Sequence, residues 1–174
     1  MRRYLGVFMV VAMAAAACGD SGEESAGAQE PDSTNAATAQ GSVADLAITE
    51  IVFGDHVTIT NLGDAAVSVD GLWLCNRPGY TELPTAAIAA GSSLDIPADA
   101  LGSLPGGGGE VALYTSNSFG DSSAMLDYVA WGSGGGRASV AEEAGLWPAG
   151  DSVDVAGSEI MAATGGAAAG DWSS

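Results

Sequence analysis

The sequence predicts an all-β antiparallel sandwich over residues 43–174, and three observations support this fold class. Apolar residues recur at every second position in several short runs, as in strands that bury one face. Turn-forming Gly, Asn, Asp and Pro residues separate these runs. Residues 98–101 could form one helical turn at most, and no other segment has the period of an amphipathic helix. The absence of alternating strands and helices argues against an α/β nucleotide-binding fold.

Seven segments are predicted to be strands. The first contains a change of phase between Ile48 and Ile51, which indicates a bulge or bend. The segment Gly71–Cys75 is apolar on both faces, so we expect a central strand that is covered on both sides. The predicted strands cover residues 46–53, 56–61, 67–70, 71–75, 94–96, 111–114 and 125–131.

Three side chains have expected roles within this sandwich. Asn61 ends an alternating strand and enters the turn at residues 62–64, where its amide can bond to the turn backbone. Trp73 and Trp131 each lie on an apolar face. Because burial of a large ring stabilises a fold by several kcal/mol, we expect both tryptophans in the core.

Several segments resemble the lamin-tail domain, and their order matches that family. They are Ile48-Thr49-Glu50-Ile51, Val57-Thr58-Ile59-Thr60-Asn61, Val69-Asp70-Gly71-Leu72-Trp73-Leu74 and Asp127-Tyr128-Val129-Ala130-Trp131-Gly132. The terminal Asp171-Trp172 is similar to the end of many bacterial members. The resemblance covers about residues 43–174 and implies an immunoglobulin-like β-sandwich. The family occurs in nuclear lamins and in exported bacterial proteins.

The N-terminus has the order of a secretory signal. A basic start with Arg2 and Arg3 precedes an uncharged apolar run over residues 4–17, and small residues lead directly into Cys18. A cysteine at this point resembles the lipobox of bacterial lipoproteins, which implies cleavage before Cys18 and lipidation of its thiol. The alternatives are a plain cleavable signal or an uncleaved membrane helix, although the run is shorter than the ~20 residues that a spanning helix needs. The two arginines leave Sec and twin-arginine export both open.

The sequence therefore divides into three parts. Residues 1–17 are the expected lipoprotein signal peptide, residues 18–42 a lipidated, flexible and acidic linker, and residues 43–174 the lamin-tail-like domain. The linker is expected to be flexible because it has no aromatic or large aliphatic residue whose burial could offset the entropy of ordering. The expected location is the extracytoplasmic face of the cell membrane or envelope, with a lipid anchor.

The charge of the chain restricts its partners. The formal net charge is −18, and removal of residues 1–17 with their two arginines changes it to −20. Such a chain repels phosphate backbones, so we expect no nucleic acid partner. Attachment to a membrane would depend on acyl chains rather than on a basic patch, because only Arg77 and Arg137 remain as cations. Multivalent cations and basic proteins are compatible with this charge.

Catalytic patterns are weak. His56 is the only histidine, so a Ser-His-Asp or Cys-His arrangement would have to use it. Three Gly-Asp-Ser triplets end at Ser21, Ser122 and Ser152, but the histidine of such an esterase would follow its serine at a long interval, whereas His56 precedes two of these serines. The glycine run at residues 106–109 lacks the Gly-Lys-Ser/Thr ending of a phosphate loop and indicates a hairpin or loop. The glycine run at residues 132–136 lacks the spacing of a nucleophile elbow and indicates a flexible connection.

Metal-binding patterns are equally limited. Zinc favours clusters of Cys and His, and this chain offers only Cys75 and His56 beyond the lipidation site. Calcium needs several oxygen ligands, for which the candidates are Asp151 with Asp154, or Asp121 with Asp127. We assign no metal site, and we expect Cys75 to be a buried thiol because Leu72, Trp73 and Leu74 precede it.

The sequence favours a non-catalytic cell-surface lipoprotein whose domain mediates protein–protein interaction or scaffolding at the cell envelope. The scarcity of His, Cys and cationic residues argues against an enzyme. We expect no cofactor and no small-molecule substrate. The alternatives are a ligand-binding module for Ca²⁺ or a saccharide, or an unrecognised extracytoplasmic hydrolase.

Overall fold

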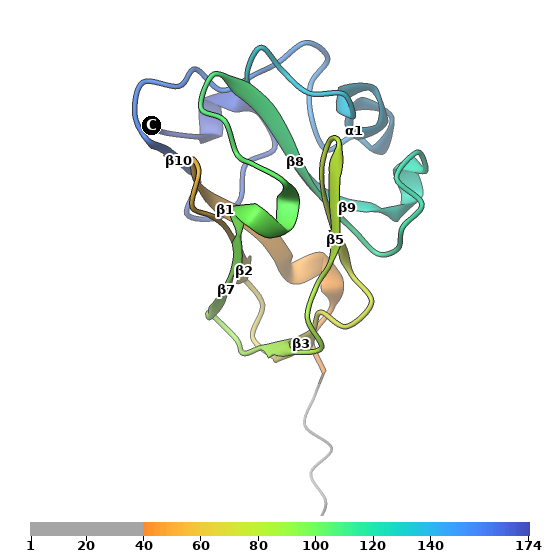
Figure 1. The fold of residues 1–174 in the computed structure, drawn as a ribbon. Helices are drawn as coiled ribbons and strands as arrows, with labels where there is room; N and C mark the ends of the chain where they lie inside the picture. Colours follow the sequence, from red (N-terminus) through yellow and green to blue (C-terminus); the bar gives the residue numbers. More distant parts are fainter. Residues whose placement is uncertain (1–39) are drawn as a thin grey trace, which may run out of the picture. The chain divides into compact units, whose positions relative to one another are not determined.

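The structure of the protein is a computed structural model, which describes residues 40–174. Its main elements are two four-stranded antiparallel sheets (Figure 1). The first sheet has the order β10-β1-β2-β7, with β10 (Glu159–Met161), β1 (Leu46–Val52), β2 (His56–Asn61) and β7 (Ser93–Pro97). The second has the order β5-β4-β8-β9, with β5 (Gly79–Glu82), β4 (Trp73–Asn76), β8 (Gly108–Tyr114) and β9 (Met125–Gly132). The short strands β3 (Val67–Ser68) and β6 (Ala87–Ile88) pair with each other. The predicted all-β antiparallel sandwich is confirmed.

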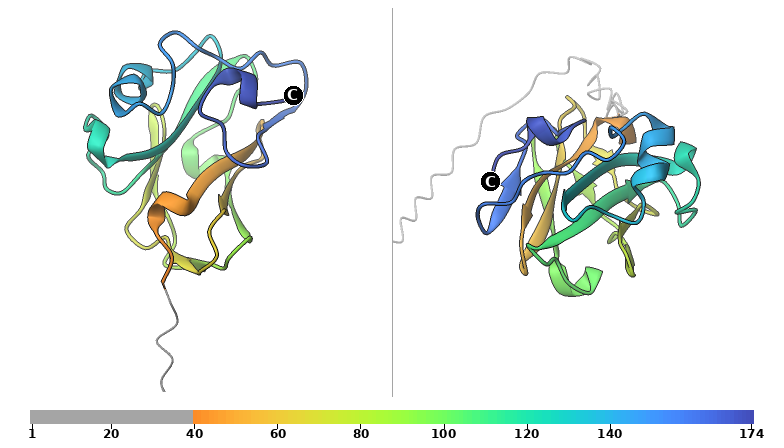
Figure 2. Two further views of the ribbon diagram at one scale, coloured as in Figure 1. Left: turned by 180° about the vertical axis from the view of Figure 1, so that it is seen from behind. Right: turned by 90° about the horizontal axis from the view of Figure 1, so that it is seen from above.

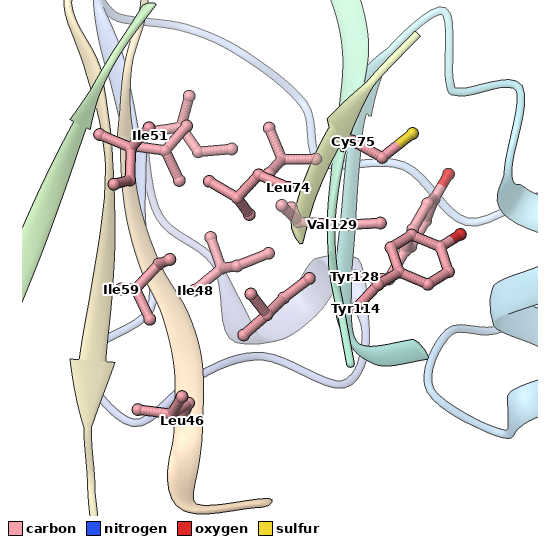
Figure 3. Packing of buried hydrophobic residues seen from close by; sticks show 14 of the residues in the cluster. Leu46, Ile48, Ile51, Ile59, Leu74, Cys75, Tyr114, Tyr128 and Val129 are labelled. Carbon is pink, nitrogen blue, oxygen red and sulfur yellow. The ribbon is translucent and has the colours of Figure 1, made fainter. Parts of the chain in front are cut away.

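The core lies between the two four-stranded sheets (Figure 3). Ile48, Ile51 and Ile59 of the first sheet point toward Leu74 and Val129 of the second, and all five are fully buried. These residues share the inward phase of their strands, so the period-two pattern of the sequence becomes one continuous apolar layer.

The predicted bulge in the first strand is present. The pairing between β1 and β2 shifts register between Ile48 and Glu50. The shift allows Ile48 and Ile51, three positions apart, to be buried on one face, which regular alternation would not permit.

Helical structure is limited to short segments in residues 40–174. The single-turn segments are η1 (Val43–Asp45), η2 (Ala98–Leu101), η3 (Ser122–Ala124) and η4 (Ala169–Asp171), and the one α-helix is α1 (Ala138–Ala144). The turn predicted at residues 98–101 is confirmed by η2. The expectation that no helix exists elsewhere was wrong, because α1 is present. This helix packs beside β9 (Figure 1 and Figure 2). With only two turns and no side-chain cap at Arg137, α1 has too little sequence pattern to be recognised.

Other predicted boundaries need correction. Strands β5, β6 and β10 had no counterpart among the predictions, because each has at most one buried residue and therefore shows no apolar alternation. Strand β8 begins at Gly108, so half of the glycine run at residues 106–109 belongs to a strand rather than to a loop. The glycine run at residues 132–136 connects the end of β9 to α1.

The first described residues, 40–42, precede the predicted start of the domain at residue 43. The backbone of Gln40 bridges to that of Ala66, and η1 begins at Val43 with Ser42 as its N-cap. The predicted signal peptide, Cys18 and the linker up to residue 39 lie outside the described residues. None of the helices in residues 40–174 has the length and apolar character needed to span a bilayer.

Candidate functional site

The outer face of the second sheet, turned away from the first sheet, carries the candidate site. Figure 3 shows Cys75, Tyr114 and Tyr128 pointing away from the core side chains of the same sheet. The segment that enters α1 lies over this face, and contacts between α1 and β9 hold it there. The central strand β4 is therefore covered on both faces, as predicted, whereas the edge strand β5 is partly exposed.

Glu110 on β8 is the centre of a polar cluster that we define as Cys75, Glu110, Tyr128 and Arg137. Its side chain is only 2% exposed. One carboxylate oxygen, Oε2, accepts hydrogen bonds from the Tyr128 hydroxyl at 3.0 Å and from the Arg137 backbone N–H at 2.6 Å. A single carboxylate thus joins β8, β9 and the start of α1.

The loop before α1 requires small residues because of this carboxylate. A Cβ atom on Gly135 would collide with Glu110 Oε2. Glycine therefore lets the loop backbone come close enough for the Arg137 N–H to reach the carboxylate. The glycine run that sequence analysis interpreted as a flexible connection has a packing function at this position.

The arginine of the polar cluster reaches outward to the sheet edge. Arg137 Nη2 donates a hydrogen bond to the Tyr80 hydroxyl on β5 at 3.2 Å. Within residues 40–174, the buried atoms Arg137 Nε and Glu110 Oε1 have no hydrogen-bond partner. The guanidinium therefore lies between the buried cluster and the exposed edge of the sheet.

The cysteine of the polar cluster is closed off from solvent. Cys75 is fully buried, as predicted. Burial raises the pKa of its thiol to about 11, and the negative charge of Glu110 adds to this effect while Arg137 opposes it. Burial also raises the pKa of the Tyr128 hydroxyl. At neutral pH both groups are protonated, so they act as neutral packing and hydrogen-bonding groups rather than as nucleophiles.

An aromatic patch, defined as Trp73, Tyr80 and Phe119, lies at the β5 edge of the same face. The ring centroid of Phe119 is 4.3 Å from that of Tyr80 and 5.9 Å from that of Trp73. Tyr80 is 37% exposed. Trp73 is only partly buried, so its predicted place in the core is confirmed in part, whereas Trp131 is fully buried as predicted.

A hollow of about 340 Å³ opens at the start of β5. Gly79, Leu101 and Pro105 contribute to its walls, and Arg77 is the only charged residue that lines it. Arg77 Nη1 donates a hydrogen bond to the Gly136 carbonyl at 3.2 Å. Both arginines that follow the predicted signal peptide are therefore at this end of the second sheet.

The candidate catalytic residues are not brought together as a triad. The nitrogen atoms of His56 lie near two carboxylates, with Nδ1 3.0 Å from Asp55 Oδ2 and Nε2 4.0 Å from Glu50 Oε2. Ser152 Oγ donates to the Gly132 carbonyl at 2.9 Å. Ser122 begins η3, and Ser21 lies outside the described residues.

Three of the carboxylates considered for calcium accept hydrogen bonds from the backbone. Asp121 accepts from Ser123, Asp127 from Ile48 and Tyr128, and Asp151 from Ser152 and Ala169. Between residues 40 and 174, no group of three or more His, Cys, Asp or Glu side chains could hold a metal ion.

Sequence reasoning missed Glu110 and Arg137 as parts of one cluster. The available signal was strand phase, because Glu110, Ala112 and Tyr114 share one face of β8 once the strand is extended back to Gly108.

Comparisons with protein-family models, with curated proteins and with solved structures found no match.

Proposed function

We propose that this chain is a non-catalytic lipoprotein that is anchored through Cys18 at the extracytoplasmic face of a membrane, where its β-sandwich binds another protein. The observation that carries the proposal is the order of the N-terminus, with Arg2 and Arg3, an apolar run and small residues before Cys18. An anchor of this kind raises the local concentration of the domain at one surface and favours encounters with partners there.

The non-catalytic part of the proposal is supported by how the reactive side chains are used. The thiol of Cys75 is buried and has a raised pKa. His56 lies beside Asp55 and Glu50 instead of a serine. Glu110 uses one oxygen to hold Tyr128 and the backbone of Arg137. Each group has a structural role that accounts for its position.

The binding part of the proposal is supported by the aromatic patch and its two neighbouring arginines. Aromatic residues and arginine are enriched at protein interfaces and carry much of the binding energy there. Tyr80 presents an exposed ring that stacks on Phe119, and the hydroxyl of Tyr80 is held by Arg137. A preformed patch of this composition reduces the entropy lost on binding.

The lamin-tail, immunoglobulin-like assignment is also part of the proposal. It is supported by the placement of the four resembling segments. Three of them fall on β1, β2 and β9, and the other, residues 69–74, leads into β4 at Trp73. The alternating residues of these segments, among them Ile48, Ile59 and Val129, form the core between the sheets.

The proposal is tested by crosslinking on intact cells. The chain has no lysine, so a carbodiimide that joins its carboxylates to amines of a partner is the suitable reagent. We expect a discrete adduct with the native chain and a much weaker one with Cys18→Ser, which would be released from the membrane. A control with the signal and linker fused to an unrelated domain should give no such adduct. Equal adducts with this control, or turnover of an ester, phosphate or glycoside by the purified chain, would contradict the proposal.

A further inference from the structure

We propose that the free edge of β5 takes up an extended segment of the partner protein as an added strand, and that this segment carries a carboxylate side chain. The inference rests on the proposed function, namely that the domain binds a protein, and it names the surface and the chemistry of the bound segment. Strand addition to an open sheet edge is a common mode of peptide recognition.

The register of β5 identifies the backbone groups that face away from β4. Strand β5 is the end strand of its sheet and pairs only with β4, with Cys75 opposite Tyr80 and Trp73 opposite Glu82. The Leu83 N–H donates to the Leu72 carbonyl at 2.8 Å just beyond this pairing. Because antiparallel pairs alternate between hydrogen-bonded and non-hydrogen-bonded positions, the backbone groups of Tyr80 and Glu82 point away from β4. The Glu82 carbonyl accepts a hydrogen bond from Thr81 Oγ1 at 3.3 Å, and its second lone pair can accept from an added strand. These backbone groups are spaced correctly for one more strand.

Two of the other sheet edges are covered by backbone segments. At β10, the backbone of Met161 exchanges two hydrogen bonds with that of Ser173. At β9, the segment around Val153 bonds to the backbone of Ala130 and Gly132. Strand β7 ends at Pro97, and a proline lacks the N–H that a further strand would need. Within residues 40–174, β5 and β7 are therefore the four-stranded-sheet edges that no backbone segment covers, and Pro84 follows β5 as Pro97 ends β7. The charges distinguish the two edges, because both arginines of the domain lie near β5 whereas β7 carries Asp95.

The side chains near β5 select an acidic segment. Arg77 and Arg137 both lie near the start of β5, beside the exposed ring of Tyr80. The domain has no other arginine and no lysine, so a carboxylate of the partner is attracted here and repelled by most of the remaining surface. Glu82 lies at the opposite end of β5 and disfavours a carboxylate there. These charges fix the position of the partner's carboxylate along the strand.

The hollow at the start of β5 adds a second specificity element. Its walls include Leu101 and Pro105, and a Cβ atom on Gly79 would collide with the Leu101 carbonyl. Its volume of about 340 Å³ can hold one apolar side chain of the added segment. The expected ligand is therefore an extended segment in which a carboxylate residue lies close to an apolar one.

Site-specific photocrosslinking in intact cells tests this inference with the full chain. The photoreactive residue p-benzoylphenylalanine replaces Glu82 on β5 or, as the matched control, Ser93 at the exposed edge strand β7. We expect an adduct from position 82 and little from position 93. Mass spectrometry should place the adduct in an extended partner segment that contains Asp or Glu. In the position-82 chain, Arg77→Gln should lower the adduct yield about tenfold, while Arg77→Lys should retain most of it.

Three results would overturn the inference. They are an adduct from position 93 that equals or exceeds that from position 82, an adduct yield that Arg77→Gln leaves unchanged, and an adduct mapped to residues 19–39 of this chain. The carbodiimide experiment separates this inference from the proposed function. If carbodiimide captures a partner and position 82 does not, the β5 inference fails while the proposed binding function stands. If neither captures a partner, both fail.

Discussion

The carboxylate of Asp127 on β9 accepts a hydrogen bond from the backbone N–H of Ile48 on β1, with 2.7 Å between Oδ2 and N. This bond joins the two sheets beside the register shift in β1. The second oxygen, Oδ1, accepts from the Tyr128 N–H at 2.8 Å. Burial raises the pKa of Asp127 to about 6, although both N–H donors act in the opposite direction.

This raised pKa predicts a specific dependence of stability on pH. Between about pH 4 and pH 6 the folded chain binds a proton at Asp127 that the unfolded chain has lost. The stabilisation from Asp127 is therefore complete below about pH 4 and is lost as the pH rises through about 6, a change of about 3 kcal/mol. We expect Asp127→Asn to remove this contribution. The measurement is the free energy of urea unfolding from pH 3.5 to 7.5 for both chains, and parallel pH profiles would contradict the prediction.

The side chain of Asn61 forms hydrogen bonds with backbone groups in and near the turn after β2. Its Nδ2 donates to the carbonyls of Ala65 and Ile88 at 2.8 and 2.9 Å, and its Oδ1 accepts from the Gly63 N–H at 3.0 Å. Because Asn61 is fully buried, Asn61→Ala leaves these groups unpaired and should lower the free energy of unfolding by about 2–4 kcal/mol. The exposed variant Asp64→Asn is the control and should change it by less than about 0.5 kcal/mol. A similar effect of both variants in urea unfolding would show that Asn61 does not hold the turn.

Substitutions of Glu110 test whether its charge or its hydrogen bonds stabilise the folded chain. Glu110→Gln retains an acceptor for the Tyr128 hydroxyl and the Arg137 N–H, and it removes a buried charge. We expect it to change the free energy of unfolding by less than about 1 kcal/mol, whereas Glu110→Ala should lower it by about 2–4 kcal/mol. Thermal and urea unfolding of the two variants give the comparison. A loss of stability as large for Gln as for Ala would indicate that the ionised carboxylate is required.

The sequence pattern predicted those parts of the fold in which many residues repeat one signal. Alternation at Val57, Ile59 and Asn61 was sufficient to place β2, and the change of phase after Ile48 was sufficient to place the bulge in β1. Burial of Trp131 and Cys75 followed from apolar neighbours on their own strands. Local patterns of this kind are preserved because each residue contributes to the same buried layer.

The polar cluster and α1 could not be predicted, because they depend on contacts between distant segments. Glu110 follows a run of glycines and has the appearance of an exposed loop acid until Arg137, 27 positions later, reaches its carboxylate. Helix α1 has only seven residues, so packing against β9 rather than helix propensity determines where it forms.

The labelling rate of the Cys75 thiol measures how well the outer face of the second sheet is shielded from solvent. In the Cys18→Ser chain it is the only thiol. Because it is fully buried and its pKa is about 11, we expect labelling by a maleimide at pH 7 to be at least ~100-fold slower than in urea-unfolded chain. Labelling of the native chain at a rate close to that of the unfolded chain would show that the segment before α1 opens readily.

The proposed anchor is tested most directly by the intact mass of the protein. The full sequence is expressed in a bacterium that processes lipoproteins, and the chain is extracted from the membrane fraction. The predicted mass is that of a chain that begins at Cys18 and carries a diacylglycerol group on the thiol and an acyl group on the new amino terminus. A mass without lipid, or a chain that still begins at Met1, would contradict the proposal that Cys18 attaches this domain to a membrane.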